Sequence, residues 1–261
     1  MKLSIVIPSH KDTHLHKTIK SLLDNAEGDI EILPVLDGYT PRTAITSDPR
    51  VRIIRHKVNQ GMRESINTGV AASKGKYLMR VDEHCMFNPG YDLLLLEEIE
   101  DNWIVNIRRK FLDPEKWEVM GDKQIDYEKL LIIEKPQKNR TKFSAVEWWS
   151  RSRKRRHIPL DEDMAMQGSV WVMPRYWWDK VIERLDSNGY GTLYQDTTEM
   201  LFKTWRAGGK LMLNKKTWFA HKHRDFNRTH DYPGKLADAS FKFALDTWGE
   251  DYKKVKERWG V

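Results

Sequence analysis

The sequence predicts an α/β fold in which helices flank a mostly parallel central sheet. Short apolar runs alternate with segments whose apolar residues recur at helical spacing, and this alternation is typical of such sheets. The runs are continuously apolar, as expected for strands that are buried on both faces. Polar residues follow three of these runs, at 8–10, 37–38 and 82–84. Because parallel sheets bind ligands at the carboxyl ends of their strands, we expect one site there.

The first third of the chain contains the clearest pattern. Each apolar run stops at a proline, glycine or charged residue, and each helical segment repeats its apolar residues every three or four positions. The predicted strands are Leu3–Ile7, Ile30–Leu36, Val51–Ile54 and Tyr77–Val81. The predicted helices are His14–Asn25 and Gly61–Ser73.

The rest of the chain predicts further strands and helices around one ambiguous stretch. Residues 110–156 are rich in Lys and Glu and give no clear pattern, except for a hairpin-like piece near Leu130–Ile133. The strands expected elsewhere are Trp103–Arg108, Met166–Met173, Leu211–Leu213 and Thr217–Ala220. The expected helices are Tyr91–Ile99, Arg175–Leu185, Asp196–Ala207 and an amphipathic one over Lys235–Val261.

The composition favours a globular protein with anionic partners. The chain has 261 residues, of which 39% are hydrophobic and 32% charged, with a formal net charge of +7. A basic protein favours nucleotide phosphates, nucleic acid, acidic glycans or a membrane surface, and the charge does not choose among them. The single cysteine, Cys85, excludes an internal disulfide and fits a reducing compartment. We expect a cytoplasmic protein without a membrane span.

Asp82 and His84 are candidate metal ligands. They lie two positions apart at the end of a predicted strand, so both side chains point to the same side of an extended chain. A carboxylate with an imidazole suits Mn²⁺ or Mg²⁺ better than a thiolate site does. The alternative is a polar turn after a buried strand, in which Asp82 caps the following segment.

Two later features each have a structural and a functional interpretation. Asp196 lies near the start of a predicted helix. Its carboxylate is either stabilised there by the helix dipole or acts as a general base. The basic run Arg151–His157, which follows Trp148 and Trp149, is either a solvated loop or an electrostatic contact for an anionic donor or acceptor.

Several motifs occur in a fixed order and together resemble one family. The opening strand and turn, the Asp-Gly after the second strand, the Asn-x-Gly repeats and the Asp-x-His-Cys segment belong to this series. So do the Gln-Gly-Ser strand, the Asp-Thr-Thr-Glu helix start and the His-x-x-Arg segment. They lie at 4–10, 36–38, 59–77, 82–85, 166–169, 196–209 and 221–224. This series resembles GT-A fold glycosyltransferases of the family-2 group, and its metal motif is similar to that of the polypeptide N-acetylgalactosaminyltransferases.

The resemblance implies a nucleotide-sugar donor, with a UDP-sugar favoured, and a divalent metal ion, Mn²⁺ or Mg²⁺. The implied metal ligands are Asp82, His84 and His221. The implied donor-binding residues are Pro8, Ser9, His10, Asp37, Arg63 and Arg224. Asp196 is the expected base of an inverting transfer, and Glu199 shares the site or caps the helix. If the reaction retains configuration, Asp196 instead orients the donor or the acceptor.

The resemblance leaves the acceptor open. It implies a GT-A domain over residues 1–224, with a lid-like loop and a C-terminal helix over 225–261 packed on the same domain. We expect the acceptor hydroxyl on a glycan or protein, or on a hydroxymethylated DNA base reached through the Arg151–His157 run. The alternative is a non-catalytic GT-A-like module that binds nucleic acid or glycan.

Overall fold

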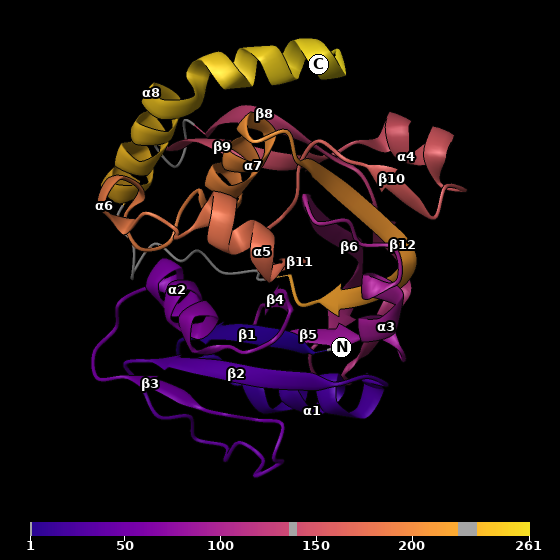
Figure 1. Cartoon of the computed structure of the whole chain (residues 1–261), viewed down its shortest axis with the longest axis vertical. Coiled ribbons are helices and arrows are strands. Elements are labelled where there is room, and N and C mark those ends of the chain that lie inside the picture. Colours follow the sequence, from indigo (N-terminus) through magenta and orange to yellow (C-terminus); the bar gives the residue numbers. More distant parts are fainter. Residues whose placement is uncertain (1, 136–139, 224–233) are drawn as a thin grey trace.

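The computed structural model of the protein describes residues 2–135, 140–223 and 234–261. A mixed central sheet lies between helices (Figure 1), with the strand order β10-β12-β6-β11-β4-β1-β2-β3. β5 pairs with β12 and β7 pairs with β6, while β8 and β9 form a separate hairpin. The predicted α/β class with a mostly parallel sheet is confirmed. The strands are β1 (Leu3–Ser9), β2 (Ile30–Asp37), β3 (Ile54–His56), β4 (Tyr77–Val81), β5 (Cys85–Phe87), β6 (Trp103–Asp113), β7 (Glu118–Ile125), β8 (Glu128–Lys135), β9 (Arg140–Glu147), β10 (Leu160–Glu162), β11 (Val170–Pro174) and β12 (Lys210–His221).

Helices cover both faces of the sheet. α1 and α3 pack on one face, and α2 and α7 pack on the other. α5 continues directly into a π-helical segment, Trp178–Ile182. The helices are α1 (Leu15–Asn25), α2 (Met62–Ala72), α3 (Tyr91–Leu96), α4 (Trp149–Arg155), α5 (Arg175–Trp177), α6 (Ser187–Tyr190), α7 (Asp196–Arg206) and α8 (Gly234–Trp259).

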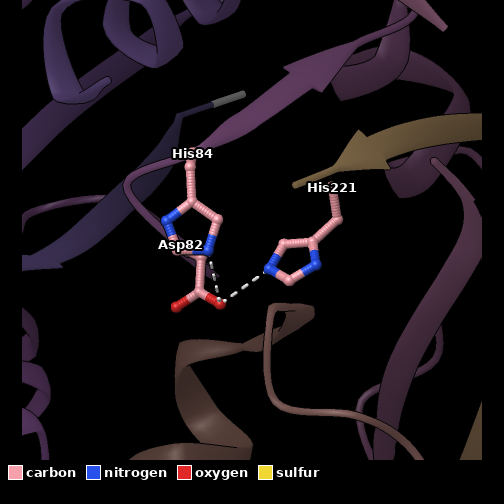
Figure 2. A group of neighbouring side chains, drawn as sticks. All are labelled: Asp82, His84 and His221. Carbon is pink, nitrogen blue, oxygen red and sulfur yellow. Dashed lines mark hydrogen bonds and ion pairs between the residues drawn. The ribbon is translucent and has the colours of Figure 1, made fainter. Parts of the chain in front are cut away.

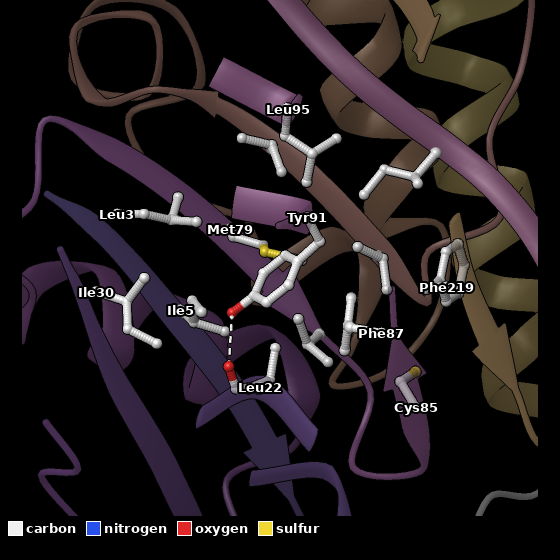
Figure 3. Close-up of a cluster of buried hydrophobic side chains, with 14 of the residues drawn as sticks. Leu3, Ile5, Leu22, Ile30, Met79, Cys85, Phe87, Tyr91, Leu95 and Phe219 are labelled. Carbon is white, nitrogen blue, oxygen red and sulfur yellow. Dashed lines mark hydrogen bonds between the residues drawn. The ribbon is translucent and has the colours of Figure 1, made fainter. Parts of the chain in front are cut away.

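The two faces share the side chains of each central strand. In β1, Ile5 and Ile7 pack toward α1, whereas Val6 packs toward α2, because successive side chains of a strand point to opposite faces. Figure 3 shows the cluster on the α1 face, where the Tyr91 hydroxyl donates a hydrogen bond to the Leu22 carbonyl oxygen at 3.3 Å. The continuous apolar runs of the sequence are therefore strands with two buried faces.

The strand directions bring the polar strand ends to one edge. β1, β2 and β4 run parallel, so the segments that follow Ser9, Asp37 and Val81 lie at the same edge of the sheet. β12 runs parallel to β6, and β11 is antiparallel to both β4 and β6. The start of β11 therefore lies where its neighbours end, and the amide of Asp82 donates a hydrogen bond to the Ser169 carbonyl oxygen at 2.7 Å.

Two strand predictions were wrong in detail. The short strands expected at 211–213 and 217–220 form one strand, β12, with a register shift between Asn214 and Trp218. The polar residues between them predicted a break, but Asn214 donates to the Leu94 carbonyl oxygen at 3.0 Å and Lys215 to the Tyr127 hydroxyl at 2.7 Å. Their polar atoms are thus satisfied inside the strand. The strand expected at 51–54 is β3, Ile54–His56, with an isolated bridge at Val51.

Residues 110–156, which show no clear pattern in the sequence, form strands and a helix. This stretch contains the end of β6, all of β7, the β8–β9 hairpin and α4, and the hairpin-like piece near Leu130 was placed correctly. The charged residues mask the pattern because only one face of the hairpin is buried. Leu130 and Phe143 belong to a third apolar cluster with Trp248 and Tyr252 of α8. α8 therefore packs on this hairpin and on α7.

The division of the chain at residue 224 stays a prediction. The proposed lid loop falls on residues 224–233, outside the described residues, as does Arg224. Within the described part of the chain, no helix has the length and apolar character needed to cross a membrane.

Candidate active site

Asp82, His84 and His221 meet at the polar edge of the sheet (Figure 2). Asp82 follows β4, His84 precedes β5, and His221 is the last residue of β12. The antiparallel pairing of β5 with β12 sets His221 opposite Cys85 and hence beside His84. Each residue offers one ligand atom, and these atoms lie within 4.8 Å of one another. The sequence separates these residues by up to 139 positions, and the sheet brings them together.

The three donor atoms face a common point. Nε2 of His221 lies 3.1 Å from Oδ2 of Asp82, and Nε2 of His84 lies 3.8 Å from the same oxygen. The two imidazole rings are 4.8 Å apart between centroids. Both histidines are buried, and the Asp82 side chain keeps 19% of its surface exposed. A small ion can therefore reach the group from the side of Asp82.

Neighbouring charges hold the ligands in place. Arg80 donates a hydrogen bond to Oδ1 of Asp82 at 2.7 Å, which leaves Oδ2 for the histidines. Nδ1 of His84 lies 3.1 Å from Oδ2 of Asp12. Because a carboxylate only accepts, the ring proton sits on Nδ1, and Nε2 is the ligand atom on the side of Asp82. Sequence reasoning missed Asp12. Its position in the loop after the first strand was the available signal.

The protonation states of the site fit metal binding. Burial raises the pKa of Asp82, but the charge of Arg80 and the two imidazoles outweigh it and hold that pKa well below its usual range. Burial lowers the pKa of His221 to about 4, against the opposing effect of Asp82. At neutral pH the group thus offers an anionic oxygen and a neutral imidazole. Nδ1 of His221 is buried without a hydrogen-bond partner among the described residues. Residues of this kind fit a divalent ion.

Asp37 organises the loop beside this group. Its carboxylate accepts hydrogen bonds from the amides of Gln60 at 2.8 Å and Gly61 at 2.7 Å, and it lies 2.8 Å from Nδ1 of His56. Its own backbone carbonyl oxygen lies 2.7 Å from Nδ1 of His10. Asp37 is buried, so its side chain holds the start of α2 against the end of β2.

The other predicted donor residues of this edge lie near a cavity but do not line it. Pro8 is buried inside β1, the Ser9 hydroxyl contacts the Tyr39 hydroxyl, and the His10 amide donates to Glu83 at 3.1 Å. A cavity of about 390 Å³ lies next to them, and its size suits a small-molecule site. It is lined by Lys11, Asp12, Thr13, Leu15, His16, Tyr39, Thr40, Pro41, Arg42, Thr43 and Ile45. Sequence reasoning missed Tyr39 and Arg42 because loop residues carry no periodic signal.

Arg63 and Glu199 form a buried ion pair with each other. Their side chains are 0% and 2% exposed. Arg63 also donates to the carbonyl oxygens of Tyr194 and Asp186 at 3.0 Å each, and Glu199 accepts from Lys203 at 2.8 Å. Both side chains were predicted to serve the donor or the reaction. The structure places them in the interior between α2 and α7.

Asp196 begins α7 and is 8% exposed. Its Oδ2 is buried without a hydrogen-bond partner among the described residues. Burial raises its pKa, partly offset by the charges of Arg80 and Arg63. A Cβ added to Gly168 would lie 3.2 Å from this oxygen, so the glycine allows the close approach. Arg80 thus acts on both Asp82 and Asp196.

The basic run Arg151–His157 is helical up to residue 155, where a loop was one of the two interpretations. α4 spans Trp149–Arg155, and Arg151 and Arg155 both pair with Asp161. Arg153, Lys154, Arg156 and His157 are exposed. The run lies on a different part of the fold from Asp82, at the edge near β10 (Figure 1).

The chain is similar to known glycosyltransferases. Residues 4–155 match the family model described as glycosyl transferase family 2. A putative polypeptide N-acetylgalactosaminyltransferase 13 of Drosophila melanogaster is 24% identical over 286 residues, covering 98% of this chain and 48% of that protein. EpsJ, an uncharacterized glycosyltransferase of Bacillus subtilis, is 33% identical over 107 residues, covering 38% of this chain and 31% of that protein. The chain thus spans less than half the length of these relatives.

Two solved structures share the fold. The crystal structure of GalNAc-T7 with UDP, GalNAc and Mn²⁺ superposes with a TM-score of 0.75 at 18% identity, over 97% of this chain and 50% of that one. S. aureus TarS in complex with UDP-GlcNAc superposes with a TM-score of 0.54 at 11% identity, over 89% of this chain and 61% of that one. These likenesses confirm the predicted GT-A fold.

Proposed function

The chain belongs to glycosyl transferase family 2, and we propose that it transfers a sugar from a UDP-sugar to an acceptor hydroxyl with the help of Mn²⁺ or Mg²⁺. The grouping of Asp82, His84 and His221 at the polar edge of the sheet carries this proposal. The fold neighbours add support, since GalNAc-T7 was crystallised with UDP, GalNAc and Mn²⁺ and TarS with UDP-GlcNAc.

The ligand group has a defined task. A divalent ion held by Asp82, His84 and His221 would neutralise the charge that develops on the diphosphate leaving group. Arg80 keeps Asp82 ionised, and Asp12 keeps the Nε2 lone pair of His84 available. The chain therefore supplies an oriented set of donors before any ligand arrives, which avoids the cost of ordering them later.

The cavity beside the polar edge is the proposed place for part of the nucleotide. Tyr39 offers an aromatic face, and Lys11 and Arg42 offer positive charge. Aromatic rings stack on bases, and cations pair with phosphates. Ser9 and His10 each contact Tyr39 of this cavity without lining it, and Asp37 holds the neighbouring loop.

Asp196 is the proposed base. Its unpartnered oxygen is able to accept the proton of an acceptor hydroxyl, and burial moves its pKa upward, toward neutral pH. This role requires an inverting transfer, which we favour. In a retaining transfer Asp196 would orient the donor or the acceptor. We assign Glu199 a supporting role at the same helix start, because Arg63 and Lys203 occupy its oxygens.

For the acceptor we propose a hydroxyl on a glycan or protein, or on a hydroxymethylated DNA base. The net charge of +7 supports an anionic acceptor. A strong salt dependence of acceptor binding would favour DNA, because each neutralised phosphate releases counterions. A cytoplasmic location stays a prediction.

Donor hydrolysis tests the proposal. Purified protein is incubated with Mn²⁺ and UDP-, GDP- or TDP-sugars, and release of the nucleotide is measured for the wild type and for Asp82→Ala. We expect slow, metal-dependent release from a UDP-sugar, lost in Asp82→Ala. Asp24→Ala, an exposed carboxylate on α1, is the matched control and should behave as the wild type.

The competing function is a non-catalytic module that keeps the fold and binds nucleic acid or glycan. It predicts neither hydrolysis nor metal-dependent nucleotide binding. Equilibrium binding of UDP with and without Mn²⁺ separates the two functions. If UDP binding does not depend on Mn²⁺ and no sugar is released, the transferase proposal fails.

A further inference from the structure

α4 presents two different stripes. Trp149, Arg153 and Arg156 are spaced by four and three residues, so they lie along one side of the helix. Arg151 and Arg155 are also four apart and occupy another side. The first stripe is exposed, and the Trp149 side chain keeps 58% of its surface in solvent. A short helix thus separates five large side chains into an inner and an outer set.

The inner set anchors the helix. Arg155 binds both carboxylate oxygens of Asp161, at 2.5 and 2.7 Å. Arg151 lies 3.6 Å from the same carboxylate, and its guanidinium sits over the rings of Tyr127 and Trp259, at 5.0 and 4.9 Å. These contacts fix α4 to β10 and to the end of α8, so the outer stripe is held in one orientation.

Among the described residues, no acidic side chain neutralises the cations of the outer set. No acidic residue occurs between Glu147 and Asp161. Within the described part of the chain, no ion pair involves Arg153 or Arg156 of this stripe, or the exposed Lys154 that follows Arg153. The local charge is therefore positive, and it surrounds an exposed indole. An exposed indole among unpaired cations combines an apolar body with positive charge, which suits a partner that is both apolar and anionic.

The shape of this surface favours a flat partner. α4 and β10 lie at the outer edge of the molecule (Figure 1), and the side chains of the stripe are exposed. A nucleic-acid strand is held in a groove where bases stack on several rings. An indole at the edge of a rigid helix, with cations around it, instead matches the headgroup layer of a bilayer, where tryptophan and basic residues bind together.

We propose that Trp149, Arg153, Lys154 and Arg156 form a docking surface for an anionic phospholipid bilayer. The indole enters the headgroup layer, and the three cations neutralise lipid phosphates. Binding is peripheral and reversible, because one aromatic side chain and three charges supply far less affinity than a spanning helix. The proposal is independent of the transferase activity and would hold for a non-catalytic module as well.

Vesicle sedimentation tests this surface. The intact chain is mixed with vesicles of phosphatidylcholine alone, or of phosphatidylcholine with phosphatidylglycerol at about 7:3, and the bound fraction is measured at rising NaCl. We expect binding to the anionic vesicles alone, weakened by salt because screening shortens the reach of the charges. The variant Trp149→Ala/Arg153→Glu should bind at least about tenfold more weakly.

A matched control exists on the same chain. Tyr176 and Lys180 are also an exposed aromatic and a cation four residues apart, and the Tyr176 side chain is 53% exposed. Tyr176→Ala/Lys180→Glu makes equivalent changes away from α4 and should bind vesicles as the wild type does. Equal losses in both double variants would overturn the proposal, as would wild-type protein that ignores anionic vesicles. A duplex DNA that displaces the wild type from vesicles through the α4 residues would replace the bilayer by nucleic acid as the partner.

Discussion

Two polar clusters meet near the start of α7, and they differ in what their polar atoms contact. The closed cluster is Arg63, Glu199 and Lys203, in which both carboxylate oxygens are taken by protein cations. One nitrogen of the buried Arg63 guanidinium, Nη2, lacks a hydrogen-bond partner among the described residues. The open cluster is Arg80, Asp82, His84, Asp196 and His221. There, Oδ2 of Asp196, Nδ1 of His221 and two nitrogens of Arg80 lack hydrogen-bond partners among the described residues.

The difference separates residues that hold the fold from residues that await a ligand. Asp196 and Glu199 are three positions apart on one helix, and both are acidic and buried. Residue type and position therefore do not distinguish them, whereas their hydrogen bonds do. Unsatisfied buried polar atoms are costly, so a folded protein keeps them where another molecule completes them. The four predictions below test this distinction, from the largest expected effect to the smallest.

Asp196→Asn should lower the rate of sugar transfer by about 100- to 10,000-fold, because the amide cannot accept the acceptor proton. Stability should change little, since the carboxylate gives up no hydrogen bond at Oδ2. Donor turnover and urea unfolding of the same preparation measure both quantities. An unchanged rate would show that Asp196, like Glu199, holds the fold and does not accept the proton.

Glu199→Ala should reduce the free energy of unfolding by about 3–5 kcal/mol, because it leaves Arg63 as an uncompensated buried charge. Urea denaturation measures the loss. The control is Asp251→Ala, which breaks the pair between Arg206 of the same helix and Asp251, whose side chains are 52% and 19% exposed. That change should cost less than about 1 kcal/mol. Equal losses would show that burial of the pair is unimportant.

Acid should destabilise the metal-free protein through His221. Its folded pKa of about 4 lies below the usual histidine value of 6.5, so the unfolded chain binds this proton first as the pH falls. The free energy of unfolding therefore keeps its full value above about pH 6.5 and falls by about 2–3 kcal/mol as the pH drops toward 4. We expect the free energy of unfolding, measured by urea denaturation at several pH values in this range, to change more steeply with pH for the wild type than for His221→Asn. Identical slopes would contradict a neutral, buried imidazole.

Asp12→Asn should weaken Mn²⁺ binding by about 10- to 100-fold, because Asp12 fixes the ring proton of His84 on Nδ1. Calorimetric titration with Mn²⁺ measures the affinity directly, without turnover. Asp24→Asn on the neighbouring helix is the control and should keep the wild-type affinity. If Asp12→Asn binds Mn²⁺ as tightly as the wild type, the carboxylate is not needed to orient His84.

The sequence predicted the parallel half of the sheet well. β1, β2 and β4 are buried on both faces, so their composition alone reveals them. The α4 and β7–β9 region gave no clear pattern apart from the hairpin-like piece near Leu130, because its apolar residues lie on one face and charges fill the other. Its packing against α8 depends on residues about a hundred positions away, which local patterns do not reveal.

The site was predicted in part. The Asp82, His84 and His221 group was expected from motif order, and the structure brings these residues together. Asp12 and Tyr39 were missed because each lies in a loop and acquires its role only from a neighbour in space. The roles of Arg63 and Glu199 could not be read from motif position, since their pairing joins α2 to α7 across 136 residues.

Because Gly168 has no side chain, the Asp196 carboxylate can occupy its observed position. A methyl group there would lie 3.2 Å from the carboxylate oxygen and 3.1 Å from Cγ2 of Thr197, so an alanine would require these side chains to shift by a few tenths of an ångström. Reactions between positioned groups lose about 100-fold in rate for a displacement of about 1 Å. The precision of the proposed proton transfer thus depends on a residue that touches neither donor nor acceptor. Sequence variation at position 168 would tune the reaction rate through geometry, while leaving the chemical groups of the site unchanged.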